Sequence, residues 1–126
     1  MVTKGFREML LEADAATETI GAQEALDLLG KEDAVFVDVR ESHERAQGFI
    51  PGSIHAPRGF LEFIADPEGP MHNPVFTSGK RLILYCGSGT RSALAGKTLH
   101  DMGLSNLVNL AGGIQGWLQA GGDLES

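Results

Sequence analysis

Cysteine, basic residues and long apolar runs are all scarce in this sequence of 126 residues. Its one cysteine, Cys86, cannot form an internal disulfide, a CxxC pair or a Cys-rich zinc site, which fits a reducing compartment. Ten Lys and Arg residues against seventeen Asp and Glu residues give a formal charge of −7, which disfavours binding to nucleic acid or to an anionic membrane surface. An anionic substrate therefore needs a local positive site.

Membrane segments and metal-ligand patterns are also missing. No apolar stretch approaches transmembrane length, and charges interrupt the N-terminal region before a signal-peptide core can form. We therefore expect a cytoplasmic protein. The four histidines, His43, His55, His72 and His100, show no ligand spacing, so we expect neither a metal nor another cofactor.

Strands and helices alternate along the expected order of elements. Apolar runs at 34–39, 81–85 and 107–110 are typical of buried parallel strands, and residues 53–56 form a shorter one. Helices are expected at 4–15, 22–29, 61–65, 92–102 and 113–120, with a helical turn at 41–46. Residues 66–80 hold three prolines and two glycines, which favours a long irregular connection. The alternation predicts one α/β domain with a mainly parallel sheet.

The stretch YCGSGTRS, at 85–92, places Cys86 where a strand ends and a helix begins. Ligands of open parallel sheets bind beyond the carboxyl ends of the strands. Small residues after Cys86 let the backbone point several N–H groups at one centre, and the helix adds the positive end of its dipole. These groups should favour the thiolate, whose pKa would lie below the ordinary value of about 8.5.

Arg91 can close this ring of donors or stand at its mouth as a cation for an oxyanion. Thr90 and Ser92 can add hydroxyl donors, although Ser92 equally suits the first turn of the helix. The alternative for Cys86 is a small buried apolar residue at a strand end. A packing cysteine does not need the Gly-Ser-Gly-Thr-Arg sequence that follows it, so we interpret Cys86 as a nucleophile.

Four stretches together resemble a single-domain rhodanese, of the thiosulfate sulfurtransferase-like family. They are VFVDVRESHE, GFIPGSIHAP, LILYCGSGTRSA and LVNLAGGIQGW, in the family's order, and the match runs over residues 20–121. The resemblance implies a three-layer α/β domain in which a central, mainly parallel sheet carries helices on both faces. Residues 17–126 would form this domain, and residues 1–16 an N-terminal helical arm.

In this family the cysteine that matches Cys86 attacks a sulfane sulfur, becomes a persulfide and passes the outer sulfur to a nucleophile. The resemblance implies the same enzyme activity here, with thiosulfate or a persulfide of glutathione or a protein as donor. Cyanide, thioredoxin, glutathione and sulfite are open as acceptors. The loop that would hold the thiolate and the persulfide comprises Gly87, Ser88, Gly89, Thr90 and Arg91.

Further candidates lie outside the loop. Asp38 and Arg40 come at the carboxyl end of the 34–39 strand and can border the same pocket, although the family uses this stretch mostly for structure. Glu44 follows Arg40 by four residues and is a candidate partner for it. Arg58 is a further candidate pocket cation or a solvated residue at a helix start. The glycines of GGIQGW, at 112–117, lack nucleotide-binding spacing and favour a tight turn with Trp117 packed on the sheet.

Three other functions compete with sulfur transfer as interpretations of this sequence. Cysteine phosphatases use a similar loop but place one more residue between Cys and Arg, whereas four residues separate Cys86 from Arg91. The smaller ring suits one sulfur atom rather than a phosphoryl group. Arsenate reduction would need a helper thiol from another molecule. A sulfur carrier or regulatory binding module is the non-enzymatic alternative, and such modules often lack the cysteine or the loop.

Overall fold

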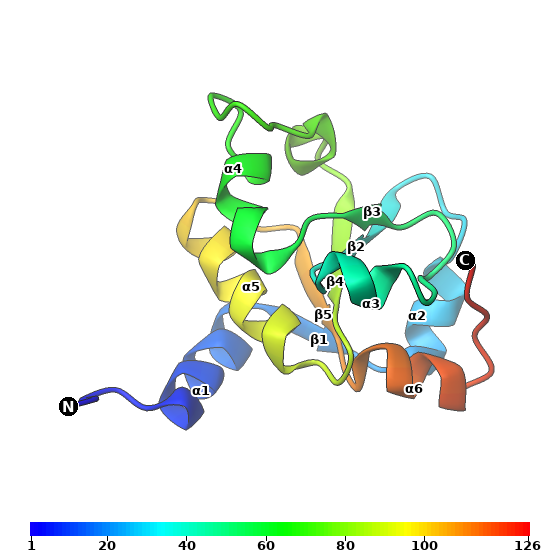
Figure 1. The fold of residues 1–126 in the computed structure, drawn as a ribbon, viewed down its shortest axis with the longest axis horizontal. Coiled ribbons are helices and arrows are strands. Elements are labelled where there is room, and N and C mark those ends of the chain that lie inside the picture. The colour runs from blue at the N-terminus through cyan, green and yellow to red at the C-terminus, as the bar shows by residue number, and fades with distance from the viewer.

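The computed structural model describes residues 1–126 and contains one sheet of five parallel strands. The strands lie in the order β1-β5-β4-β2-β3, so that β4 is central. Their bounds are β1 Glu18–Ile20, β2 Ala34–Asp38, β3 Ile54–His55, β4 Arg81–Tyr85 and β5 Leu107–Leu110. Figure 1 shows the sheet in the middle of the molecule, with the two termini at opposite sides.

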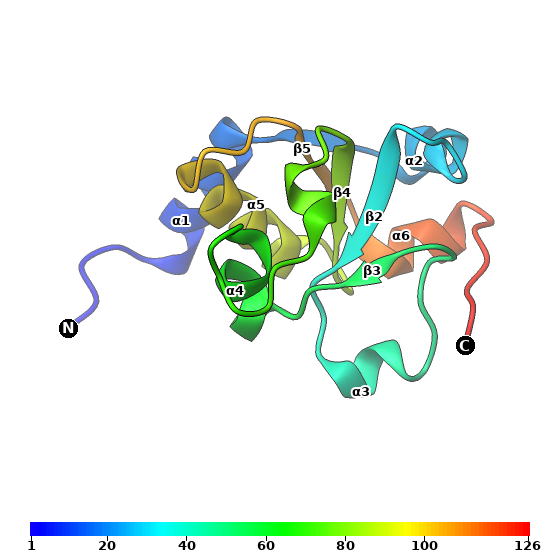
Figure 2. The same cartoon turned by 90° about the horizontal axis from the view of Figure 1, so that it is seen from above.

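Helices cover both faces of the sheet. Their bounds are α1 Phe6–Ala16, α2 Ala22–Leu28, α3 Ser42–Arg45, α4 Leu61–Ala65, α5 Thr90–Asp101 and α6 Gly113–Gln119, with short 3₁₀ turns at Arg58–Phe60 and Pro74–Thr77. Figure 2 shows α1, α4 and α5 on one side of the sheet and α2 and α6 on the other. The expected three-layer α/β architecture is confirmed. None of these helices has the length and apolar character needed to cross a membrane.

Side chains along β4 alternate between the two cores. Leu82 and Leu84 pack in the core under α4 and α5, whereas Ile83 and Tyr85 pack in the core under α2 and α6. This alternation follows from the two-residue period of a strand that is buried on both faces. Cys86 continues the pattern into the α5 core, which brings its side chain to the beginning of α5.

Most expected elements are present within a residue or two of their predicted bounds, but β1 was missed. Glu18–Ile20 is only three residues long and pairs with β5, which lies far away in the sequence. The irregular connection at 66–80 also contains the 3₁₀ turn Pro74–Thr77. Helix α1 lies against α5 and buries Ala13 completely. The division between an arm at 1–16 and a domain at 17–126 stays a prediction.

Candidate functional site

Cys86 lies directly after β4, at the carboxyl end of the central strand, and its side chain is fully buried. Three residues later, Gly89 is the N-cap of α5. Gly89 has a φ of 104°, a left-handed conformation that favours glycine, and a Cβ there would lie 3.2 Å from the backbone nitrogen of Gly112. The chain therefore turns sharply around the sulfur before the helix starts.

A second glycine-rich turn, between β5 and α6, is hydrogen-bonded to the backbone of the Cys86 loop. The backbone N–H of Ile114 donates to the carbonyl of Cys86 at 2.9 Å, and that of Gln115 donates to the carbonyl of Gly87 at 3.2 Å. Gly113 permits this approach because a Cβ at that position would overlap the Cys86 carbonyl. The turn expected at 112–117 therefore fixes the position of the Cys86 loop. Trp117, which follows this turn in α6, is fully buried in the core, as expected.

Several donors converge on the Cys86 sulfur. The backbone N–H of Gly89 donates to Sγ at 3.1 Å, and the Ser92 hydroxyl lies 3.5 Å from Sγ. Burial raises the pKa of the Cys86 thiol, but the Ser92 hydroxyl and the backbone N–H groups of Ser92, Gly89 and Ser88 lower it by more. The net result is a pKa below the ordinary cysteine value, in agreement with the charge expected from the loop.

Asn109 of β5 holds two of these groups in place. Its Nδ2 donates to the carbonyl of Gly89 at 3.1 Å, and its Oδ1 accepts from the Ser92 hydroxyl at 2.6 Å. The Ser92 hydroxyl has a single proton, so it serves either Asn109 or Cys86 at one time. We infer that the proton points to Asn109 while the sulfur is neutral and turns toward the sulfur when the thiolate forms.

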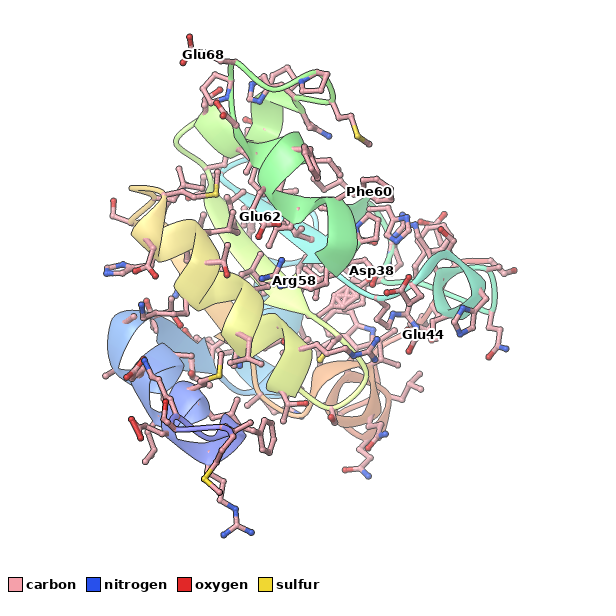
Figure 3. All side chains as sticks on the ribbon, turned by 60° about the vertical axis from the view of Figure 1, so that its left-hand side comes forward. Asp38, Glu44, Arg58, Phe60, Glu62 and Glu68 are labelled. Carbon is pink, nitrogen blue, oxygen red and sulfur yellow. The ribbon has the colours of Figure 1, made fainter.

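Arg91 stands at the beginning of α5, where its guanidinium is partly exposed and paired with Glu44. Nη1 and Nη2 of Arg91 donate to the two carboxylate oxygens of Glu44 at 2.7 and 2.9 Å. The hydrogen bonds from Arg91 lower the pKa of Glu44 to about 2, so the carboxylate is charged throughout the neutral range. Figure 3 shows Glu44 between α3 and the start of α5.

Arg40 is buried and hydrogen-bonded within the protein. Its Nε and Nη2 donate to the carboxylate of Asp38, Nη2 also donates to the Gly48 carbonyl, and Nη1 donates to the Glu44 carbonyl. The expected partnership between the side chains of Arg40 and Glu44 is therefore wrong. The carboxylate of Glu44 binds Arg91 instead, and Arg40 touches only its backbone. A contact between Arg40 and substrate stays a prediction.

Arg58 lies against the side of α5, away from its beginning. It donates to Glu62 at 3.1 Å and to the Thr98 hydroxyl at 3.0 Å. Figure 3 shows Arg58 and Glu62 together beside α5 and Glu44 at a different place on the molecule. Thr98 is two turns along α5 from the residues that surround Cys86. Contact between Arg58 and substrate therefore also stays a prediction.

The contributions of Asn109 and of Glu44 to the Cys86 loop were missed in the sequence. Both residues lie far from Cys86 along the chain and reach the loop only because β5 and α3 end beside it. A signal for Asn109 was available, since a polar residue interrupts an otherwise apolar strand at 107–110. Asn109 is buried in the structure, and a buried amide needs hydrogen-bond partners.

The alkylation rate of Cys86 is expected to follow a thiolate with a midpoint below about 8.5, because several donors face the sulfur. Ser92→Ala should move the midpoint upward, since the charged sulfur then loses the hydroxyl that turns toward it. Iodoacetamide rates measured against pH will show both values. Thr90→Val is a matched control that removes a neighbouring exposed hydroxyl. A wild-type midpoint at or above about 8.5 would mean that the donors do not stabilise the thiolate.

Comparisons with known proteins assign the chain to a family. The family model described as rhodanese-like domain matches residues 21–120. A thiosulfate:glutathione sulfurtransferase of Saccharomyces cerevisiae is 39% identical over 103 residues, which cover 76% of this chain and 74% of the yeast protein. A sulfurtransferase of Allochromatium vinosum is 32% identical, covering 75% of this chain and 80% of that protein.

A solved structure from Rhodopseudomonas palustris, described as a protein of unknown function and possible tyrosine phosphatase, is similar along nearly its whole length. It shares 42% sequence identity with this chain and a TM-score of 0.94, and the match covers 99% of this chain and 97% of that one. The family model spans most of the chain, and both of the relatives named sulfurtransferase are more than 30% identical to it. The chain belongs to the family of rhodanese-like domains.

Proposed function

We propose that this protein is a sulfurtransferase that carries sulfane sulfur on Cys86 as a persulfide. The observation that carries the proposal is the ring of donors around Sγ, formed by the Gly89 N–H, the Ser92 hydroxyl and the start of α5. A thiolate in such a ring is a nucleophile at neutral pH and does not need a separate general base. The relatives named sulfurtransferase support the same reaction class.

The proposed reaction has two displacement steps. The Cys86 thiolate attacks the outer sulfur of the donor, the sulfur–sulfur bond of the donor breaks, and sulfite or a thiolate leaves with the electron pair. An acceptor nucleophile then attacks the outer sulfur of the persulfide, and the Cys86 thiolate leaves. The backbone donors of Gly87 to Arg91 stabilise the charge on sulfur in both steps. Because the free thiolate that each cycle regenerates is best protected from oxidation in a reducing compartment, we place the protein in the cytoplasm.

A panel of donors and acceptors tests this proposal. Thiosulfate and glutathione persulfide are offered as donors, and cyanide, glutathione, thioredoxin and sulfite as acceptors. Glutathione is included because the yeast relative is named a thiosulfate:glutathione sulfurtransferase. We expect turnover with at least one pair, giving a persulfide with a thiol acceptor, thiocyanate with cyanide or thiosulfate with sulfite. If no donor–acceptor pair gave turnover, the result would favour a sulfur carrier or a regulatory binding module.

A cysteine phosphatase is the second candidate, because the Rhodopseudomonas palustris relative is described as a possible tyrosine phosphatase. Two observations oppose it. Four residues lie between Cys86 and Arg91, and each terminal nitrogen of Arg91 donates one hydrogen bond to Glu44, whose negative charge opposes the binding of a phosphoryl group. A ring of this size suits a single sulfur atom.

Loop length separates the two reactions. The wild-type protein should transfer sulfur and show negligible hydrolysis of aryl phosphates. Inserting one glycine between Gly89 and Thr90 should lower sulfur transfer at least about ten-fold, because the N–H of Gly89 leaves its place opposite the sulfur. Both activities and thermal unfolding are measured for the two proteins. Robust phosphatase activity in the wild type would overturn the argument from ring size.

A further inference from the structure

The carboxylate of Glu44 is a fixed part of the loop's mouth rather than a mobile surface group. Besides its two bonds to Arg91, its Oε1 accepts from the backbone N–H of Glu41 at 3.0 Å, in a capping box that starts α3. The next residue, Arg45, donates to the buried Asp38 at 3.1 Å and to the Ser53 carbonyl at 2.7 Å. Helix α3 is therefore tied to the core, and it delivers Glu44 to Arg91 in one geometry.

This arrangement removes the positive site that a doubly charged donor needs. The bidentate pair uses both terminal nitrogens of Arg91, and the charges of the two side chains cancel. The other arginines at this end of the sheet, Arg40 and Arg45, are hydrogen-bonded to Asp38 and to backbone carbonyls. A dianion approaching Cys86 therefore has to displace or oppose the Glu44 carboxylate.

Sulfane-sulfur donors differ in the charge that they bring to this place. Thiosulfate carries two negative charges within one small group, directly bonded to the sulfur that is transferred. An organic persulfide carries at most one charge on its reacting sulfurs, and any carboxylates lie several bonds away. An unpaired Arg91 cation would attract thiosulfate more strongly than a persulfide, so its neutralisation by Glu44 costs thiosulfate more binding than it costs a persulfide.

We propose that Glu44 is a specificity-determining residue that, by holding Arg91, disfavours dianionic donors such as thiosulfate and favours organic persulfides. Glu44 acts through Arg91 and through its own charge rather than on the reacting sulfur. The inference rests on the proposed sulfur transfer through Cys86. It predicts that the protein prefers organic persulfides over thiosulfate, a preference that does not follow from having Cys86 as the nucleophile.

The test compares donors in Glu44→Gln, which keeps the size of the side chain and removes its charge. The second-order rate constant for persulfide formation on Cys86 is measured with thiosulfate and with glutathione persulfide as donors. We expect the thiosulfate value to rise about ten-fold, the size of effect that loss of one nearby charge produces in a partly solvated site. The persulfide value should change less than about three-fold.

Glu41→Gln is the matched control, because it neutralises a carboxylate of the same capping box that does not bond Arg91. Its donor ratio should change clearly less than that of Glu44→Gln, because Glu41 acts on Arg91 through its charge alone. Thermal unfolding of all three proteins shows whether α3 is intact, and the donor ratio is insensitive to a uniform loss of active protein. An unchanged donor ratio in Glu44→Gln, or an equal change in Glu41→Gln, would overturn the role of Glu44 while leaving sulfur transfer in place. Failure of both donors to load the wild type would overturn the proposed function as well.

Discussion

Replacing Cys86 with serine is expected to reduce sulfur transfer to the rate of the uncatalysed reaction. A serine hydroxyl is not ionised at neutral pH and cannot form a persulfide, so neither displacement step can occur. The donors that face the sulfur are equally able to face a hydroxyl oxygen, and the two side chains are similar in size. The fold should therefore survive. Transfer from thiosulfate to cyanide and thermal unfolding, measured on the same samples, check both expectations.

Ser88→Ala provides the matched control, because Ser88 lies in the same loop but its side chain is exposed and no protein group bonds it. This variant should keep most of its activity, since the backbone N–H of Ser88 is retained. Comparable loss of transfer in Ser88→Ala and Cys86→Ser would indicate that any change in the loop is damaging. Substantial transfer by Cys86→Ser would show that the chemistry takes place elsewhere.

Replacing Asp38 with alanine should destabilise the protein by about 3–5 kcal/mol, the cost of breaking a buried ion pair from one side. The Asp38 carboxylate has no exposed surface and binds two cations, with Arg40 Nη2 at 2.9 Å and Arg45 Nη1 at 3.1 Å. Its removal leaves both guanidinium groups without their anion. Urea unfolding monitored by Trp117 fluorescence measures the change.

The control for Asp38 is Asp101, whose carboxylate binds Lys97 at 2.7 Å on the surface of α5. Solvent screens surface pairs of this kind, so Asp101→Ala should change the free energy of unfolding only slightly. If Asp38→Ala also lost less than about 1 kcal/mol, the buried network would not hold the end of β2 as described.

Asp38 also contributes to the pH dependence of stability. Burial raises the pKa of its carboxyl, but the hydrogen bonds and charge of Arg40, together with Arg45, lower it by more, so the folded-state pKa lies below the ordinary value. The stabilisation is therefore present above the unfolded-state pKa of about 3.9 and is lost as pH falls below it. The free energy of unfolding of Asp38→Ala should therefore fall less steeply with decreasing pH in this range than that of the wild type.

The parts of the fold and site that sequence reasoning recovered are those encoded locally. The runs that became β2, β4 and β5 are mostly apolar, and Cys86 is followed directly by the residues that surround its sulfur. Pairings between distant segments were not readable from one sequence. Strand β1 depends on β5, and Asn109 reaches Gly89 and Ser92 only across the sheet.

The mistaken partner for Arg40 has a definite physical cause. Four-residue spacing brings two side chains together only when both lie on one helix. Here α3 begins at Ser42 after an extended Glu41, with φ −73° and ψ 159°, so Arg40 lies before the helix and turns back to Asp38. Glu44 is thereby left free to bind Arg91, which is 47 residues away in the sequence.

The most direct test of the central claim is the intact mass of the wild-type protein after incubation with a sulfane-sulfur donor and removal of excess donor. Thiosulfate and glutathione persulfide are each used, since Glu44 is proposed to disfavour the first. The account predicts a species heavier by one sulfur atom, located on Cys86 by peptide mapping and lost when cyanide is added. An unchanged mass with both donors, or a sulfur carried on any other residue, would contradict it.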